Sequence, residues 1–229
     1  MTRQVMPLSE RRATVYFPAV PLADVTIRYL ELVSRSALRA KRADRGGLTF
    51  TRVPQPMPEL NRFFYAAIGG EWFWLERRPW TLTQWREYLA NPNVETWVLS
   101  DNGIPAGYCE LQKYLSGDVE LMYFGLLGAF IGKGLGAHLL TEAVERAWGL
   151  GAVRVIVNTC NLDHPKALAN YLGRGFREYR VEVQHKEVPG TPPGPWDGAL
   201  DCRDGRTAAG ADRRPFGPTG GPTSSPFRL

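Results

Sequence analysis

Three glycines at alternate positions, Gly132, Gly134 and Gly136, lie between an apolar run and an amphipathic run. The apolar run, residues 119–127, predicts a strand, and the amphipathic run, residues 135–148, has apolar side chains at helical spacing. Because glycine lacks a Cβ, the main-chain N–H groups beside it can approach an anion closely. The first turn of a helix also presents free N–H groups and the positive end of the helix dipole. The sequence therefore predicts a phosphate-binding turn between a strand and a helix.

Two common phosphate-binding motifs do not fit this spacing. A Walker A loop needs G-x-x-x-x-G-K-[ST], but Gly128 and Gly132 are one residue too close, and Gly134 replaces the Ser or Thr that would hold magnesium. A dinucleotide fingerprint needs G-x-G-x-x-G and a later acidic residue, whereas position 158 is Asn158. For the glycines taken alone, a tight turn without a ligand is the alternative.

The residues around the glycines follow the order of a known family pattern. An acidic strand residue, Glu120, comes before the glycines, and the residues that match after them are Asn161, Ala167, Tyr171, Gly175 and Phe176. With this pattern the chain resembles the GNAT family, the Gcn5-related N-acetyltransferases. The detailed resemblance covers about residues 94–180, and the fold is expected to reach back toward residue 25. The departures are Ile131, where the family usually has Arg or Gln, and a longer segment between Asn161 and Ala167.

The resemblance implies a fold and an activity. The fold is α/β, with a mixed, mostly antiparallel central sheet flanked by helices, and the alternation of predicted strands and helices independently favours the α/β class. The activity is transfer of an acetyl group from acetyl-coenzyme A, as co-substrate, directly to the primary amine of a small molecule, with an amino-acid-like amine as one candidate. The alternatives are an acyl-coenzyme A-binding module without transfer activity, a protein N-acetyltransferase, and a protein-interaction domain.

Coenzyme binding is assigned by the resemblance mainly to main-chain groups. The N–H groups expected to hold the pyrophosphate are those of Gly132, Gly134, Leu135, Gly136 and Ala137. The side chain of Lys133 either adds positive charge or points into solvent. The groups expected to pair with pantetheine are on the strand before the loop, at Phe124, Gly125 and Leu126. A glycine in a strand fits a bulge or a close backbone approach, and Asn161 is expected to bond to the pantetheine arm.

Glu120 and Tyr171 are the catalytic candidates, with Glu110 as the alternative to Glu120. Glu120 is the first candidate for the base that removes a proton from the amine, directly or through water, and Glu110 on the preceding strand is the second. Tyr171 occupies the family position of the acid that protonates the leaving thiolate. The alternative is that Glu120 is a solvated strand residue and that Tyr171 packs its ring in the core. Cys160 is not taken as a nucleophile, since a catalytic Cys–His pair depends on folded geometry.

An aromatic and basic cluster at residues 72–88 is the candidate acceptor site. Trp74 would supply an apolar wall of the kind that small ligands bind. Arg77 or Arg78 would bind a carboxylate or phosphate of the acceptor through paired hydrogen bonds. Glu110 is included as a weaker contact. The alternative is that the tryptophans fill the core and the arginines cover it.

Composition and local pattern suggest three segments. Residues 1–20 have no sustained period and are expected to be a loose leader, residues 21–188 form the acetyltransferase-like domain, and residues 189–229 are a Gly/Pro-rich tail expected to be disordered. The predicted strands are residues 25–33, 48–53, 95–100, 106–113, 119–127, 153–158 and 177–188. The predicted helices run from 58 to 65 or 68, from 81 or 83 to 90, from 134 to 148, and from 165 onward.

Net charge, apolar runs and cysteine spacing limit the partners and the cellular location that we expect. The net charge of +5 arises in residues 1–50, and residues 51–188 are close to neutral, so no nucleic-acid partner is expected. No apolar run is long enough to cross a membrane, the N-terminus lacks the apolar core of a secretory signal, and no membrane partner is expected. The three cysteines have no metal-ligand spacing, so we expect no metal and a cytoplasmic location. The resemblance allows a homodimer.

Overall fold

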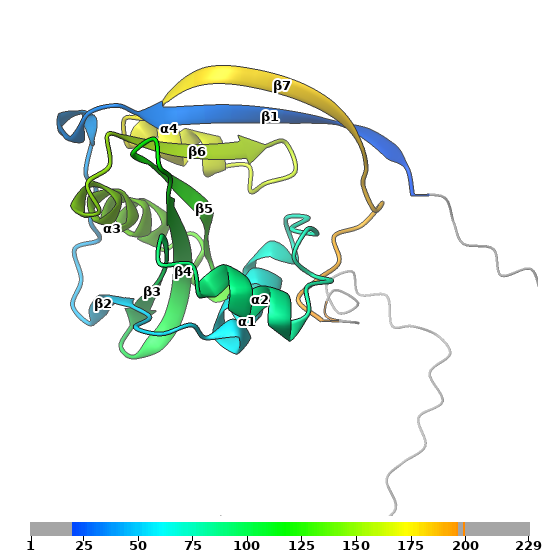
Figure 1. Cartoon of the computed structure of the whole chain (residues 1–229), viewed down its shortest axis with the longest axis horizontal. Coiled ribbons are helices and arrows are strands. Elements are labelled where there is room, and N and C mark those ends of the chain that lie inside the picture. The colour runs from blue at the N-terminus through cyan, green and yellow to red at the C-terminus, as the bar shows by residue number, and fades with distance from the viewer. Residues whose placement is uncertain (1–19, 197–198, 200–229) are drawn as a thin grey trace, which may run out of the picture.

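The computed structural model describes residues 20–196 and residue 199, in which a central sheet is flanked by helices (Figure 1). The strands of this part of the chain are β1 Leu22–Leu32, β2 Leu48–Arg52, β3 Val94–Asp101, β4 Ile104–Lys113, β5 Asp118–Leu126, β6 Arg154–Cys160 and β7 Arg177–Glu187. The helices are α1 Pro58–Gly69, α2 Leu82–Leu89, α3 Leu135–Gly149 and α4 Ala167–Gly173, with short 3-10 turns at Arg35–Ala37 and Gly128–Phe130. The expected fold class is confirmed.

The seven strands form one sheet in the order β2-β3-β4-β5-β6-β1-β7. Neighbouring strands are antiparallel except for β5 and β6, which are parallel. The antiparallel run β3-β4-β5 is connected by tight turns, in which Asn102, Gly103 and Gly117 have positive φ. A parallel pair needs a crossover connection, and α3 provides it between β5 and β6.

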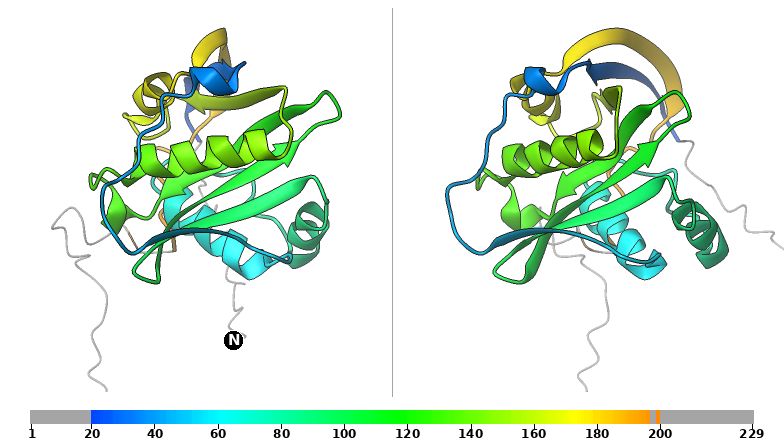
Figure 2. Two further views of the ribbon diagram at one scale, coloured as in Figure 1. Left: turned by 90° about the vertical axis from the view of Figure 1, so that its left-hand side faces the viewer. Right: turned by 60° about the vertical axis from the view of Figure 1, so that its left-hand side comes forward.

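The helices cover the sheet in two layers (Figure 2). On one side, Leu140 and Val144 of α3 pack against Leu111 and Leu121 of the sheet, in a cluster that also contains Tyr171 of α4. On the other side, Phe64 and Ile68 of α1 pack against Tyr108 of β4. Alternate residues of a strand point to opposite faces, so β4 contributes to both layers.

Local sequence signals explain where the helices begin. Pro58 is in the first turn of α1, where its fixed φ suits a helix and its missing N–H costs nothing. Thr81 and Gln84 form a capping box at the start of α2, since each side chain accepts a hydrogen bond from the other residue's main-chain N–H. The residue before α3 is Gly134, in the left-handed conformation with φ of 78°.

Strands β5 and β6 pair only at their first residues. The parallel register joins Asp118–Glu120 to Arg154–Ile156 and extends no further. On its other side β5 stays paired with β4, but the register shifts between Glu110 and Leu111, which leaves Met122 as an extra residue in β5. The separation of β5 from β6 gives the sheet an opening with free main-chain groups along one side of β5.

The described chain remains in contact with the domain beyond residue 188, where the composition changes. Val188 is buried, and its N–H donates to Pro21 O at 3.0 Å. Gly194 N donates to Gly70 O at 2.9 Å, and Arg78 Nη1 donates to Gly194 O at 2.7 Å. The first residues of the Gly/Pro-rich segment therefore pack on the end of α1. The expected leader (residues 1–19) and most of the expected tail (residues 197–198 and 200–229) lie outside the described residues.

Candidate active site

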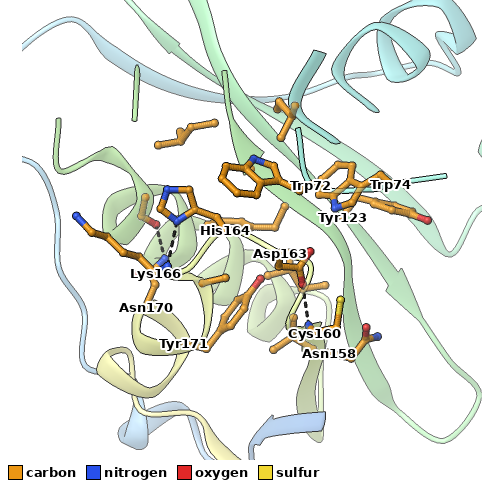
Figure 3. Close-up of a pocket in the computed structure, with 18 of the residues that line it drawn as sticks. Trp72, Trp74, Tyr123, Asn158, Cys160, Asp163, His164, Lys166, Asn170 and Tyr171 are labelled. Carbon is orange, nitrogen blue, oxygen red and sulfur yellow. Dashed lines mark hydrogen bonds between the residues drawn. The ribbon is translucent and has the colours of Figure 1, made fainter. Parts of the chain in front are cut away.

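A cavity of about 770 Å³ occupies the opening between β5 and β6. It is bordered by both strands, by the glycine-rich turn before α3, by α4 and by the loop after α1. Figure 3 shows Trp72, Trp74 and Tyr123 along one side, and Lys166, His164 and Asn170 toward the other end. Its volume suits a ligand of drug size or a coenzyme arm with a small second ligand.

The glycine-rich turn forms the N-terminal edge of α3. Gly132 and Gly134 have φ of 83° and 78°, a conformation that L-amino acids with side chains rarely adopt. A Cβ at either position would meet no atom within 4 Å, so the backbone conformation, not crowding, requires glycine there. No side chain caps α3, so the N–H groups of its first turn are available for a ligand.

Basic groups line the same cavity as this turn. Lys41, Lys166 and Arg174 line the cavity. The main-chain N–H of Lys41 donates to Thr141 Oγ1 of α3 at 2.9 Å, and α4, which Lys166 precedes and Arg174 follows, is joined to α3 by Asn170 Nδ2 and Gly136 O at 3.1 Å. Arg174 Nε is buried without a hydrogen-bond partner among the described residues. An unpaired cationic donor beside free helix N–H groups fits the phosphates of a coenzyme.

Some predicted residues of the turn line the cavity, and two others, Leu135 and Lys133, do not. Gly132, Gly134, Gly136 and Ala137 line the cavity, and their binding to the pyrophosphate stays a prediction. The side chain of Leu135 is fully buried in the core, which leaves only its main-chain N–H for a ligand. Lys133 is exposed, does not line the cavity, and its ammonium lies 5.1 Å from the centre of the Phe130 ring.

The edge of β5 lies along the cavity as expected. Phe124, Gly125 and Leu126 all line it. The bulge of this strand is at Met122 and not at Gly125. Gly125 instead allows a close approach, because a Cβ there would lie 2.4 Å from Ile68 Cγ2 of α1.

Asn161 is not where the resemblance places it. Its amide accepts a hydrogen bond from Thr26 N at 2.9 Å and donates to Asp24 O at 3.1 Å, and it does not line the cavity. Asn161 therefore holds the loop after β6 against β1. As a correction to the expected pantetheine contact, its side chain bonds to β1 and does not face the cavity. The longer segment after Asn161 instead brings Asp163 and His164 to the cavity.

Glu120 lines the cavity at the point where β5 and β6 separate. Tyr114 Oη donates to Glu120 Oε2 at 2.6 Å, and Asn158 Nδ2 donates to Glu120 Oε1 at 3.3 Å. Burial, with Glu120 as the next cause, raises the pKa of Tyr114, so this hydroxyl keeps its proton and remains a donor. Each carboxylate oxygen retains a further acceptor site for a ligand proton.

Tyr171 also lines the cavity, from α4. Its side chain is 6% exposed, and its ring packs against Phe124 and Phe176. Burial, and to a lesser extent the charge of Asp163, raises the pKa of Tyr171. The hydroxyl has no hydrogen-bond partner within the described part of the chain, so a protonated donor is available to a ligand.

Most of the predicted acceptor residues lie outside the cavity. Trp74 lines the cavity, but Arg77, Arg78 and Glu110 do not. Arg77 and Glu110 form an ion pair of 2.7 Å and are 4% and 0% exposed. Arg78 bonds to Gly194 O. The arginines therefore bond to other parts of the domain, and Glu110 has no access to an amine.

Arg77 is enclosed by aromatic rings. Its guanidinium lies 4.0 to 5.6 Å from the ring centres of Tyr88, Tyr123, Trp80 and Trp85. Asn61 Nδ2 donates to Glu110 on the other side at 2.9 Å. This buried network lies behind the cavity wall that contains Tyr123.

Several residues that face the cavity have no equivalent in the sequence prediction. They are Met122, Tyr123, Asn158 and Asp163, whereas Trp72 and Glu76 lie within the aromatic and basic cluster predicted at residues 72–88. Tyr123 comes three residues after Glu120, which predicts opposite faces in a regular strand. The extra residue Met122 instead places both side chains on the same face of β5. Glu120 is opposite Gln112 and Tyr123 is opposite Glu110, and Gln112 and Glu110 share a face of β4.

Cys160 and His164 do not form a catalytic pair. Burial raises the pKa of the Cys160 thiol, which disfavours the thiolate. His164 Nδ1 accepts a hydrogen bond from Lys166 N at 3.0 Å, and its ring lies 4.8 Å from that of Trp72. The described residues contain no cluster of three or more His, Cys, Asp or Glu side chains suited to a metal ion. They also contain no helix long and apolar enough to cross a membrane.

Solved structures share this architecture. A GCN5-related N-acetyltransferase from Kribbella flavida has a TM-score of 0.53 and 17% identity, covering 72% of this chain and 59% of its own. One from Sphaerobacter thermophilus has a TM-score of 0.53 and 17% identity, covering 76% and 56%. A tandem GNAT protein from the clavulanic acid biosynthesis pathway has a TM-score of 0.50 and 15% identity, covering 74% and 55%. This chain thus spans less than two thirds of each.

These likenesses define the fold as that of the GCN5-related acetyltransferases. The model of the acetyltransferase (GNAT) family matches residues 56–176, which is more than half of the chain. The chain belongs to the GNAT family. No curated protein sequence matches it.

Proposed function

We propose that this protein transfers an acetyl group from acetyl-coenzyme A directly to the primary amine of a small molecule. The main support is that one cavity joins the glycine-rich turn, the free edge of β5, Glu120 and Tyr171. Acetyl-coenzyme A supplies an activated thioester carbonyl when bound. Because the cavity has the glycine-rich turn in one part of its lining and Glu120 in another, both substrates can bind in it together.

The first step is to hold and orient the coenzyme. The N–H groups around Gly134 and Gly136 and the charges of Lys41, Lys166 and Arg174 attract its phosphates. The unpaired main-chain groups of β5 at residues 124–126 fix the extended arm by strand-like hydrogen bonds. A main-chain N–H in this segment also polarises the thioester carbonyl as an oxyanion donor.

The second step is proton transfer. An amine attacks only as the free base, and Glu120 takes the proton from the ammonium. The amine nitrogen then forms a bond to the carbonyl carbon, the bond from that carbon to sulfur breaks, and the nitrogen releases its second proton to solvent. Tyr171 donates its phenolic proton to the departing thiolate and regains one from solvent. The raised pKa of Tyr171 keeps this proton in place before transfer.

The experiment is release of free thiol from acetyl-coenzyme A across a panel of primary amines. Amine-dependent release with a matching acetylated product is the expected result. Thiol release without an acetylated amine would indicate hydrolysis and contradict the proposal. Calorimetric binding of acetyl-coenzyme A without turnover on any amine would instead support a binding module.

A further inference from the structure

The cationic side chains of the cavity lie apart from two of its three carboxylates. Its cationic side chains, Lys41, Lys166 and Arg174, come from segments that contact α3 at Thr141 and Gly136. The carboxylates of Glu76 and Glu120 come from the loop after α1 and from the face of β5 that α1 covers. The third carboxylate, Asp163, comes from the loop before α4 and accepts hydrogen bonds from Thr159 Oγ1 and Cys160 N. The proposed coenzyme end is therefore basic, and the other end is acidic.

The acidic end has an aromatic wall, which we call the acceptor wall and define as Trp72, Trp74, Glu76 and Tyr123. The rings of Trp74 and Tyr123 are 4.9 Å apart at 61°, and Tyr123 Oη donates to Glu76 Oε2 at 3.3 Å. Glu76 is exposed at the rim, and Trp72 lies nearer His164 (Figure 3). Aromatic faces next to a carboxylate attract cations.

The acceptor wall is fixed before a ligand binds. Phe73, between the two tryptophans, has φ of 58°, a conformation uncommon for a bulky residue. Trp72 N and Trp74 N both donate to Gly69 O. The Trp74 side chain occupies the space of a Cβ at Gly69, with atoms 2.3 to 2.4 Å from that position. The left-handed turn at Phe73 thus places both indole rings at the cavity.

The described residues offer no cation for an acceptor carboxylate at this end. Arg77 is neutralised by Glu110 inside the aromatic network, and Arg78 is directed to Gly194 O. Neither guanidinium lines the cavity. An amino-acid-like acceptor would place its carboxylate near Glu76 and Glu120 without compensation.

We infer that the acceptor is a diamine or polyamine, whose second ammonium group binds at Glu76 and the acceptor wall. The reacting amine then lies near Glu120, and the carbon chain between the two nitrogens covers the apolar surface of Trp74. This inference rests on the proposed function and replaces the amino-acid-like acceptor with a substrate that has two positive charges.

Three five-carbon acceptors test this inference: pentane-1,5-diamine, pentylamine and 5-aminopentanoate. They share the reacting amine and differ only at the far end. We expect kcat/KM to fall in that order. The value for the diamine should be about tenfold above that for 5-aminopentanoate, because Glu76 modestly attracts the far ammonium of the diamine and modestly repels the far carboxylate of 5-aminopentanoate. Higher salt should narrow the difference, since Glu76 is exposed.

Charge reversal at the wall gives the matched test. Glu76→Lys should lower kcat/KM for the diamine about tenfold and reverse the preference toward 5-aminopentanoate, with little change for pentylamine. Glu87→Lys makes the same change at an exposed residue of α2 away from the cavity and should leave the order unchanged.

The outcomes separate the two proposals. Turnover with equal or greater preference for 5-aminopentanoate in the natural protein, or an unchanged order in Glu76→Lys, overturns the acceptor class while the acetyltransferase proposal stands. Absence of thiol release with every amine, including pentylamine, overturns the proposed function and the acceptor class together.

Discussion

At the scale of single residues, Tyr171 combines a buried ring with an unpaired hydroxyl in the cavity. A hydroxyl used only for packing would be replaceable by hydrogen, whereas an acid would not. This difference distinguishes the proposed catalytic role of Tyr171 from a role in packing the core alone.

The variant Tyr171→Phe tests this role. It should lower kcat by about 10²-fold or more, since general acid catalysis contributes effects of that size. Coenzyme affinity, measured by calorimetry, should change little because the ring remains. Tyr179→Phe, at an exposed tyrosine of β7, is the matched control. Wild-type turnover in Tyr171→Phe would show that another group protonates the thiolate.

At the scale of elements, the start of α3 depends on the backbone of its glycine-rich turn. Gly134→Val places a β-branched residue at φ of 78°, which costs about 1–2 kcal/mol of strain and tilts the nearby N–H groups. Acetyl-coenzyme A affinity should fall about tenfold. Gly149→Val, at the other end of α3, has open space around its Cβ and no positive φ. Equal affinity in a folded Gly134→Val would refute the phosphate assignment.

The acceptor wall is positioned by α1, which gives a second prediction at this scale. Gly69→Ala would put a methyl group onto the Trp74 ring and displace the wall. KM for the amine should rise several-fold, while coenzyme affinity stays unchanged, because the glycine-rich turn is on another element. Gly173→Ala adds the same methyl group in α4, with no atom within 4 Å, as the control. An equal loss of coenzyme affinity would indicate general unfolding instead.

At the scale of the whole molecule, the pair of Arg77 and Glu110 connects the loop after α1 to the sheet. Glu110→Gln leaves the buried guanidinium without its counter-ion and should lower the free energy of unfolding by about 3–5 kcal/mol. The double variant Arg77→Met with Glu110→Gln should regain part of this loss, since no buried charge remains unpaired. Urea denaturation measures both changes. A single variant as stable as the natural protein would mean that solvent reaches the pair.

The buried network around Arg77 and Glu110 also explains why part of the acceptor site predicted from the sequence lies outside the cavity. Two adjacent arginines among tryptophans are compatible with a carboxylate site and with a buried structural cluster. The difference depends on Glu110, which is 33 residues from Arg77 in the sequence and enters the network only through the sheet. A local pattern does not contain that contact.

The sequence by itself determined the strands, the helices and the glycine-rich turn, because hydrophobic period, proline and glycine act over a few residues. It also determined Glu120 and Tyr171 as candidates, and the structure brings both to one cavity. Only the tertiary structure decided that Asn161 is bonded to β1 and that Arg77 is paired. The extra residue Met122 likewise placed Tyr123 beside Glu120. These outcomes depend on contacts between distant segments, which fix register and burial only when the sheet assembles.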